Sequence, residues 1–169
     1  MALLPILRYP DKRLYQKAAP IADINPDIRD LARDMAETMY AAPGVGLAAT
    51  QVDVHKQLIV IDTSEARDTL LVLINPVIMA REGSQYCEEG CLSVPGVYEP
   101  VERAEWIHVR AMGLNGKAFE LESEKLQAVC IQHEMDHLLG KVFVDYLSRL
   151  KQNRIRAKMQ KLLRQSAGV

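Results

Sequence analysis

The chain has 169 residues, of which 49% are hydrophobic and 25% charged, and its formal net charge is −1. These values are typical of one globular domain and give no overall electrostatic attraction to nucleic acid or to a membrane. The N-terminal stretch lacks a basic region, no run approaches the roughly 18 apolar residues of a membrane span, and the three cysteines indicate reduced thiols, so a cytoplasmic protein is expected.

The first predicted elements are an extended, proline-marked arm over residues 1–24 and a helix. Asn25 is the expected N-cap of that helix, Pro26 suits its first position, and the helix should end near Pro43. Its apolar residues recur at helical spacing and predict one buried face. These residues are Ile28, Leu31, Ala32, Met35 and Met39.

Short β-type runs follow, over residues 58–61, 70–74, 77–79, 106–109 and 118–121. Turn signals at Asn75-Pro76, Glu82-Gly83 and Asn115-Gly116 divide them, and the last is typical of a hairpin. A second helix is predicted over residues 124–139, with Ser123 as its cap and Gly140 just past its end, and a third over residues 148–165. Strands bracketed by helices, without βαβ alternation, predict an α+β fold with mainly antiparallel sheets around the second helix, in one domain over residues 1–169.

The second predicted helix carries a H-E-x-x-H metal motif. His133 and His137 are four positions apart, about 40° around the helix axis, so both imidazoles can face one ion. Glu134 lies beside them, where it can take a proton from a metal-activated water. The rest of that face is apolar and predicts a buried helix: Leu126, Val129 and Cys130.

The third ligand is predicted to lie upstream of the motif. The pattern H-E-x-x-H-x-x-G-x-x-H would need a histidine where Phe143 stands, and no His or Glu follows His137. Cys91, in the glycine-marked stretch 89–93, is the best candidate, although by itself it is compatible with a small buried hydrophobe. The other cysteines and histidines are interpreted as non-ligands: Cys87, Cys130, His55 and His108.

Two imidazoles and one thiolate leave a coordination position open, which is typical of catalytic sites. A structural zinc module would close with a fourth protein ligand, for which Cys87 is available, but Glu134 would then have no purpose. The thiolate also lowers the formal charge at the ion, so the bound water is less acidic and a neighbouring base matters more. Glu134 is that base, and it can return the proton to the leaving amine.

Three blocks of sequence stand out together: GVGLAATQ at residues 44–51, EGCLS at residues 89–93 and QHEMDH at residues 132–137. With these blocks, the chain resembles the peptide deformylase family over essentially its whole length. The resemblance implies a hydrolase that uses metal-activated water to release formate from N-formylmethionyl peptides. Such an enzyme acts in the N-terminal processing step of protein biosynthesis.

The resemblance also implies roles for individual residues. The implied metal ligands are Cys91, His133 and His137, and the family metal is Fe²⁺, which Zn²⁺, Ni²⁺ or Co²⁺ can replace. Glu134 becomes the general acid and base, while the Gln51 side chain and the Leu92 amide donate to the formyl oxygen. The implied substrate-binding residues are Val45, Gly46, Cys87, Glu89, Gly90, Leu126, Val129 and Cys130.

The predicted C-terminal helix is strongly basic, and no acidic residue follows Asp145. Its cations are Arg149, Lys151, Arg154, Arg156, Lys158, Lys161 and Arg164. Their uncompensated charge predicts an anion-seeking surface, and the resembled bacterial family uses this tail to reach the ribosome. The alternative is a solvated basic face. No membrane and no specific nucleic-acid sequence is expected as a partner.

Two other functions stay open on the sequence. An H-E-x-x-H endopeptidase shares the motif but needs a downstream ligand that this chain lacks. A non-enzymatic zinc module would need four protein ligands and would hydrolyse nothing.

Overall fold

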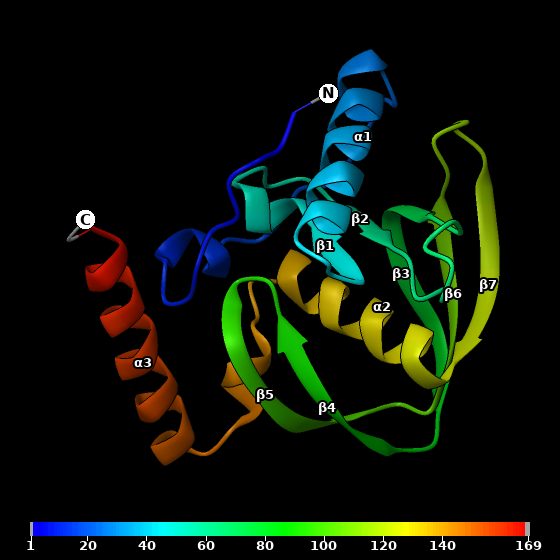
Figure 1. Ribbon diagram of the computed structural model, residues 1–169. Coiled ribbons are helices and arrows are strands. Elements are labelled where there is room, and N and C mark those ends of the chain that lie inside the picture. Colours follow the sequence, from blue (N-terminus) through cyan, green and yellow to red (C-terminus); the bar gives the residue numbers. More distant parts are fainter. Residues whose placement is uncertain (1, 168–169) are drawn as a thin grey trace.

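We describe residues 2–167 in a computed structural model (Figure 1). Five strands form an antiparallel sheet in the order β1-β2-β3-β6-β7, and β4 and β5 form a second, two-stranded sheet. The larger sheet comprises β1 (Gly46–Ala48), β2 (Leu58–Ile61), β3 (Leu71–Glu82), β6 (Trp106–Met112) and β7 (Ala118–Glu124). The other elements are β4 (Gln85–Cys91), β5 (Val94–Arg103), α1 (Pro26–Ala41), α2 (Lys125–Leu138), α3 (Arg149–Ala167) and the 3-10 helices η1 (Lys12–Tyr15), η2 (Ala49–Val52) and η3 (Phe143–Tyr146). The predicted α+β fold with antiparallel sheets is confirmed.

Helix α1 forms as its sequence predicts. The Asn25 side chain accepts a hydrogen bond from the Ile28 amide at 3.1 Å, and Pro26 occupies the first helical position. The buried face of the helix packs against β1 and β2. No helix among residues 2–167 combines the length and apolar character needed to cross a membrane.

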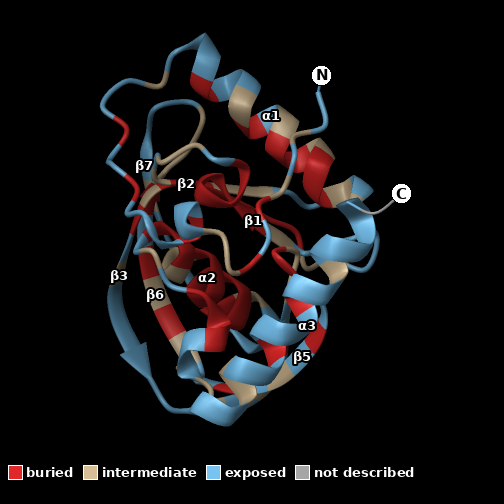
Figure 2. Cartoon of the chain, turned by 90° about the vertical axis from the view of Figure 1, so that its left-hand side faces the viewer, coloured by how far each residue is buried: buried red, intermediate tan, exposed pale blue. Residues whose placement is uncertain are grey.

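Helix α2 lies in the middle of the molecule, between the two sheets (Figure 1), and most of its residues are buried (Figure 2). The prediction that Ser123 caps this helix is wrong. Strand β7 runs directly into α2, Ser123 is still paired with Ile107 in the sheet, and Glu124 holds the N-cap position without a side-chain hydrogen bond. Gly140 does lie just past the C-terminal end, with a φ of 78°.

Strand β3 continues through Asn75-Pro76, where the sequence predicts a turn between two strands. The structure has an irregularity there instead: Asn75 has a φ of 51°, and the register with β6 shifts between Ile74 and Val77. The Asn75 side chain exchanges two hydrogen bonds of 2.8 Å with the backbone of Ile21. The N-terminal arm therefore holds the irregular residue, and the strand resumes beyond it.

The hairpin of β4 and β5 is absent from the sequence-based prediction. Cys91, expected in a loop, is the last residue of β4. The hairpin faces α2 through His133, which lies 2.8 Å from Glu89 of β4. On its far side, Val94, Val97 and Val101 of β5 pack with Ile155 and Met159 of α3.

Candidate active site

Three metal-ligating side chains converge where the hairpin meets α2. The Cys91 Sγ lies 3.4 Å from the His137 Nε2, which is 3.3 Å from the Nε2 of His133. All three donor atoms lie within 4.8 Å of one another, and both histidines are buried. The two residues of the H-E-x-x-H motif and the upstream cysteine thus meet in space, although 42 and 46 positions separate them in the chain.

The donor set fits a metal ion. The carboxylate of Glu89 can only accept a hydrogen bond, so the Nδ1 of His133, 2.8 Å away, carries the hydrogen and its Nε2 presents a lone pair. The Cys91 sulfur accepts from the Gln51 side-chain amide and the Ser93 amide, both at 3.4 Å. The sulfur and the imidazole nitrogens are electron-rich donor atoms that lie within 4.8 Å of one another, an arrangement that a metal ion between them would stabilise.

A buried ion-pair network contacts His133 at its Nδ1, on the opposite side of the ring from the metal-facing Nε2. Arg103 of β5 donates two hydrogen bonds to Glu89, of 2.7 and 2.8 Å, and a third of 2.6 Å to Asp136. Burial alone would raise the pKa of Glu89, but the bonds from Arg103 and His133 lower it below its ordinary value. Tyr146 donates to the same Asp136 at 2.7 Å. The network keeps the Glu89 carboxylate charged and so fixes the tautomer and orientation of His133.

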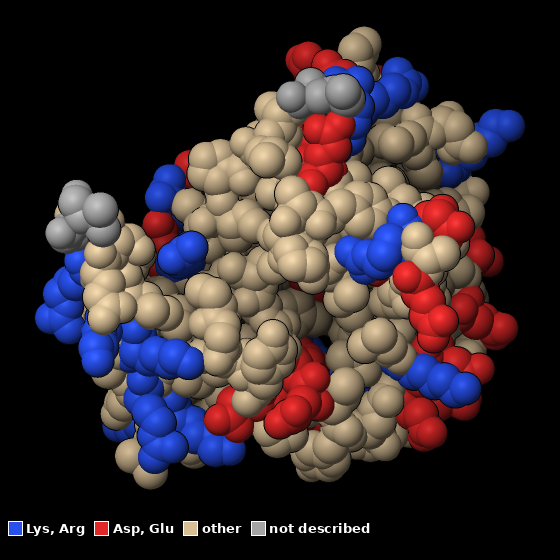
Figure 3. Space-filling view, in the orientation of Figure 1, with Lys and Arg blue, Asp and Glu red and all other residues tan. Residues whose placement is uncertain are grey.

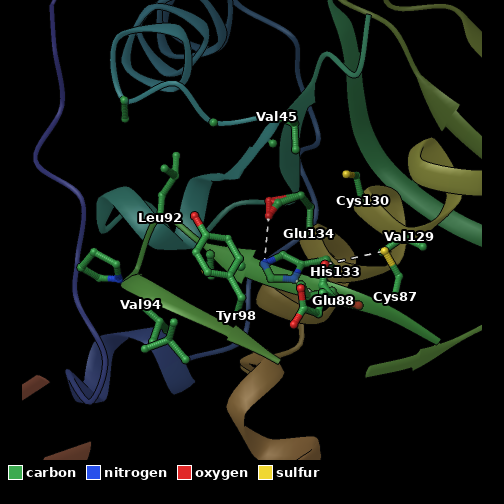
Figure 4. Close-up of a pocket in the computed structure, with 18 of the residues that line it drawn as sticks. Val45, Cys87, Glu88, Leu92, Val94, Tyr98, Val129, Cys130, His133 and Glu134 are labelled. Atoms are coloured by element: carbon green, nitrogen blue, oxygen red, sulfur yellow. Dashed lines mark hydrogen bonds and ion pairs between the residues drawn. The ribbon is translucent and has the colours of Figure 1, made fainter. Parts of the chain in front are cut away.

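Glu134 lies beside this centre in an unusual state for a carboxylate. It is 2% exposed, its Oε1 is 3.6 Å from the His133 Nε2 (Figure 4), and its Oε2 is buried without a hydrogen-bond partner among the described residues. Burial raises the pKa of this carboxyl to about 7. An unpaired buried oxygen costs roughly 1–3 kcal/mol, so its retention marks a group that awaits a further partner.

Gly46 makes room for Glu134. A Cβ atom at position 46 would lie 3.0 Å from the Glu134 Cγ and 3.3 Å from its Oε2, closer than ordinary packing allows. Glycine at this position therefore lets the backbone of β1 run directly past the carboxylate.

Gln51 and Leu92 flank the sulfur from two directions. The Gln51 Oε1 accepts from the Ala48 amide at 2.9 Å, so its NH₂ group is turned towards Cys91 and the Ser93 hydroxyl, 3.0 Å away. Leu92 follows Cys91 in the turn between β4 and β5, and its amide has no hydrogen-bond partner within residues 2–167. Two N–H groups are thus held next to the metal-ligating residues.

A cavity of about 440 Å³ opens beside the three ligands, at the hollow in the middle of the face in Figure 3. All eight substrate-binding residues expected from the sequence line it: Val45, Gly46, Cys87, Glu89, Gly90, Leu126, Val129 and Cys130. The Glu89 carboxylate, however, is committed to Arg103 and His133. Burial raises the pKa of Cys130 to about 12, so this thiol stays neutral and the lining near it is apolar.

The structure adds residues that the sequence did not indicate. Tyr98 and Val94 of β5 form part of the cavity lining (Figure 4), as does Val97, and Arg103 supports His133. They were missed because β5 was not recognised as a strand. Burial does alternate along β4, with Glu89 inside and Glu88 and Gly90 outside, but the sequence shows no matching apolar and polar alternation because the inward residue is a glutamate.

The remaining histidines lie outside this centre. The His55 Nε2 is 3.0 Å from the carbonyl oxygen of Arg13, and the His108 Nε2 is 3.8 Å from Glu120 on the neighbouring strand. Neither belongs to the metal-ligating group found among the described residues, and the same holds for Cys87 and Cys130.

Comparison with known proteins gives a consistent result. Residues 3–153 match the family described as polypeptide deformylase. The chain is 62% identical over 164 residues to peptide deformylase 2 of Nitrosomonas europaea, covering 97% of this chain and 89% of that protein. It is 61% identical over 165 residues to peptide deformylase 1 of Burkholderia multivorans, covering 97% and 91%.

Solved structures show the same relationship. The crystal structure of a peptide deformylase from Legionella pneumophila superposes with a TM-score of 0.94 at 46% identity, covering 98% of both chains. The peptide deformylase from Ehrlichia chaffeensis, solved in complex with actinonin, gives a TM-score of 0.92 at 38% identity, covering 95% of this chain and 98% of that one.

Proposed function

Because this chain belongs to the polypeptide deformylase family and removes the N-formyl group from nascent peptides, we propose a role for each site residue in that reaction. Cys91, His133 and His137 hold one metal ion, and Glu134 is the general acid and base. The observation that carries this proposal is the convergence of three ligand atoms beside a buried, unpaired carboxylate oxygen.

We propose Fe²⁺ as the native metal, with Zn²⁺, Ni²⁺ or Co²⁺ able to replace it. When bound, such an ion supplies Lewis-acid chemistry, because it polarises the formyl carbonyl and acidifies water. One sulfur and two imidazole ligands suit each of these metals. If the metal is iron, activity should decay in air and persist in nickel-loaded protein, because an open iron site beside a thiolate is sensitive to oxidation. Equal lifetimes in air for the two forms would count against iron.

In this proposal Glu134 moves the proton. Its Oε2 has no hydrogen-bond partner among the described residues and can accept a proton from the attacking water. The same oxygen then returns the proton to the amine that leaves as formate is released. Gly46 keeps the space beside the carboxylate free for these atoms.

The proposed oxyanion donors are the Gln51 side-chain amide and the Leu92 backbone amide. The first is oriented by the bond from Ala48 to its oxygen, and the second has no partner among residues 2–167. Donors held in place before the reaction stabilise the charge that develops on the formyl oxygen, and losing one typically costs about 10²–10³-fold in rate.

The substrate peptide is proposed to lie extended between two free strand edges. Strand β1 ends the five-stranded sheet, and β4 belongs to a two-stranded sheet, so backbone near Val45 and Gly90 can pair with a peptide. The methionine side chain would then enter the cavity lined by Cys87, Val129 and Cys130. A polarisable, apolar lining suits an unbranched thioether.

We further propose that the whole chain is one catalytic domain that acts in the cytoplasm, and that α3 binds the ribosome. Seven cations lie on α3 without an acidic residue, and Figure 3 shows Lys and Arg side chains gathered over α3, at the left of the view. A surface of this kind attracts the phosphates of RNA.

The direct test is formate release from formyl-Met-Ala-Ser by protein prepared without oxygen. We expect turnover that a chelator abolishes and added metal restores. Cleavage of an internal peptide bond with the formyl group intact would instead indicate an endopeptidase. Stoichiometric metal without any hydrolysis would indicate a structural site.

A further inference from the structure

One wall of the cavity is a glycine segment, defined here as residues 44–46, that touches the catalytic machinery at both ends. A Cβ atom at Gly44 would lie 2.6 Å from the Leu92 side chain, and one at Gly46 would lie 3.0 Å from Glu134. With so little clearance, the position of the segment must be set closely. The residues that set it lie outside the cavity lining.

Two consecutive carbonyl groups of the glycine segment are held by the stretch that follows β2. The Asp62 amide donates to the Val45 carbonyl at 2.9 Å, and the Arg67 Nη2 donates to the Gly44 carbonyl. The other nitrogen of the same guanidinium, Nη1, donates to the Asp62 carbonyl at 2.7 Å. Arg67 therefore bridges the glycine segment and the end of β2.

The guanidinium of Arg67 is itself held in place. It lies over the ring of Tyr40, 5.0 Å from the centroid, and the Tyr40 hydroxyl donates to the Asp62 carboxylate at 2.6 Å. Asp62 is 1% exposed and also accepts from the amides of Ser64 and Thr69. Arg67 has a φ of 56°, a left-handed conformation that is costly for a non-glycine residue and persists only where its surroundings require it.

The bridge alters how β1 and β2 end. In a regular antiparallel pair, residues that exchange one hydrogen bond exchange two, so Asp62 would also accept from the Val45 amide. Arg67 donates to that carbonyl instead, and the Val45 amide has no acceptor among residues 2–167. Val45 lines the cavity and is 38% exposed.

We propose that Arg67 is a positioning residue for peptide binding. By occupying the Asp62 carbonyl and holding the Gly44 carbonyl, it ends the β1–β2 pairing one hydrogen bond early and leaves the Val45 amide for a backbone carbonyl of the substrate. This inference rests on the proposed binding of an extended peptide along the glycine segment. Arg67 does not touch the metal ligands, so its effect should depend on whether the substrate has a peptide carbonyl.

The test compares two substrates in the variant Arg67→Gly, because glycine adopts a positive φ without strain and only the side chain is lost. The first substrate is formyl-Met-Ala-Ser. The second is N-formyl-3-(methylthio)propylamine, which keeps the formamide and the thioether but has no peptide carbonyl. We expect kcat/KM for the peptide to fall about 10-fold through KM, as for one lost backbone hydrogen bond, and kcat/KM for the carbonyl-free substrate to stay unchanged.

Two further variants sharpen the result. Arg67→Lys keeps the charge, but its single ammonium nitrogen cannot replace the two guanidinium nitrogens that donate to different carbonyl groups. The kinetic changes should therefore match those of Arg67→Gly. Arg110→Ala removes an exposed arginine on β6 that does not belong to the cavity lining, and it should leave kcat/KM for both substrates unchanged. Metal content and Tm of each variant show whether the centre and fold are intact.

An equal loss on both substrates, or no loss on either, would overturn the role of Arg67. Failure of the wild-type protein to release formate from either substrate would overturn the proposed function together with this inference. The two failures are therefore distinguishable in one set of assays.

Discussion

Helices α2 and α3 both carry many ionisable side chains, but those of the metal motif on α2 are buried and most of those on α3 are exposed. On α2, His133, Glu134 and His137 are buried, and Asp136 accepts hydrogen bonds from Arg103 and Tyr146. On α3, every cation except Lys151 is exposed, and the buried residues are Ile155 and Met159.

This difference in burial determines how the charged groups of each helix contribute to stability and binding. Buried groups stabilise one another only as a complete set, because removing one member leaves the next without its partner in a medium of low polarity. Exposed charges contribute little individually, are screened by salt, and act through their sum. Substitutions on α2 and its contacts should therefore have large effects on metal binding, catalysis and stability, whereas substitutions on α3 should have small effects on catalysis.

The largest effect should follow Cys91→Ala. Removing the sulfur leaves two imidazoles, so stoichiometric metal and all measurable deformylation should be lost together. Metal analysis after dialysis, alongside formate release, checks this. Cys87→Ala and Cys130→Ala are the matched controls, because both thiols line the same cavity outside the three-ligand group, and both variants should keep the metal. Metal retained by the Cys91 variant and lost from either control would show that the third ligand is misassigned.

Glu134→Gln should lose activity but keep the metal. The amide has nearly the same shape but cannot take a proton from water, so kcat should fall by about 10³-fold, within the range of general acid–base catalysis. Metal content should equal that of the wild-type protein, since Glu134 is not a ligand in this proposal. Loss of the ion along with activity would identify Glu134 as a ligand instead.

The local parts of this centre could be read from the sequence, and the long-range parts could not. The histidine pair is visible because i and i+4 share one face of a helix, and α1 is visible from its cap and spacing. The β4–β5 hairpin is not, because Pro95, Gly96 and Pro100 weaken the strand signal and the partner of the hairpin is α2, far along the chain. Arg103 and Arg67 act through contacts that only the folded chain creates.

Disrupting the network behind His133 should have the next largest effect. In Glu89→Gln the amide can still accept from the His133 Nδ1, but the charge that offsets Arg103 is lost. We expect metal affinity to fall about 10–100-fold, as for other groups that orient a metal-ligating histidine. A competition titration with a chelator measures this directly. Unchanged metal affinity would show that the ring orientation of His133 does not depend on the Glu89 charge.

Removing Arg103 from the same network should affect the stability of the fold more than the affinity for the metal. Arg103→Ala leaves Glu89 and Asp136 without their shared cation, and the Arg103 and Glu89 side chains are each only 4% exposed. Breaking a buried pair in this way costs about 3–5 kcal/mol, so the midpoint of urea unfolding should fall markedly. Arg110→Ala provides the control on an exposed strand position. A midpoint equal to that of the control would contradict the view that the buried set acts as a unit.

The smallest effect on catalysis should come from α3, where the structure separates two kinds of cation. Lys151 donates to Glu99 at 2.9 Å and Lys158 to the Gly96 carbonyl at 3.0 Å, so both are committed to the body of the protein. Arg154 and Lys161 are exposed and have no hydrogen bond or ion pair with any described residue. If α3 binds ribosomal RNA, exposed cations without a partner, such as Arg154 and Lys161, should make the contact.

The double variants Arg154→Gln/Lys161→Gln and Lys151→Gln/Lys158→Gln therefore form a matched test, with two charges removed from the same helix in each. We expect both to hydrolyse formyl-Met-Ala-Ser at nearly the wild-type rate. The first should lose most co-sedimentation with ribosomes at low salt, and its salt dependence should be shallower by about 0.7–0.9 in log–log slope per lost phosphate contact. The second should sediment like the wild type, because its lysines already have partners. Wild-type binding by both variants would mean that α3 is only a solvated basic face. Equal loss of binding in both would mean that the total charge of α3, and not Arg154 and Lys161 in particular, determines binding.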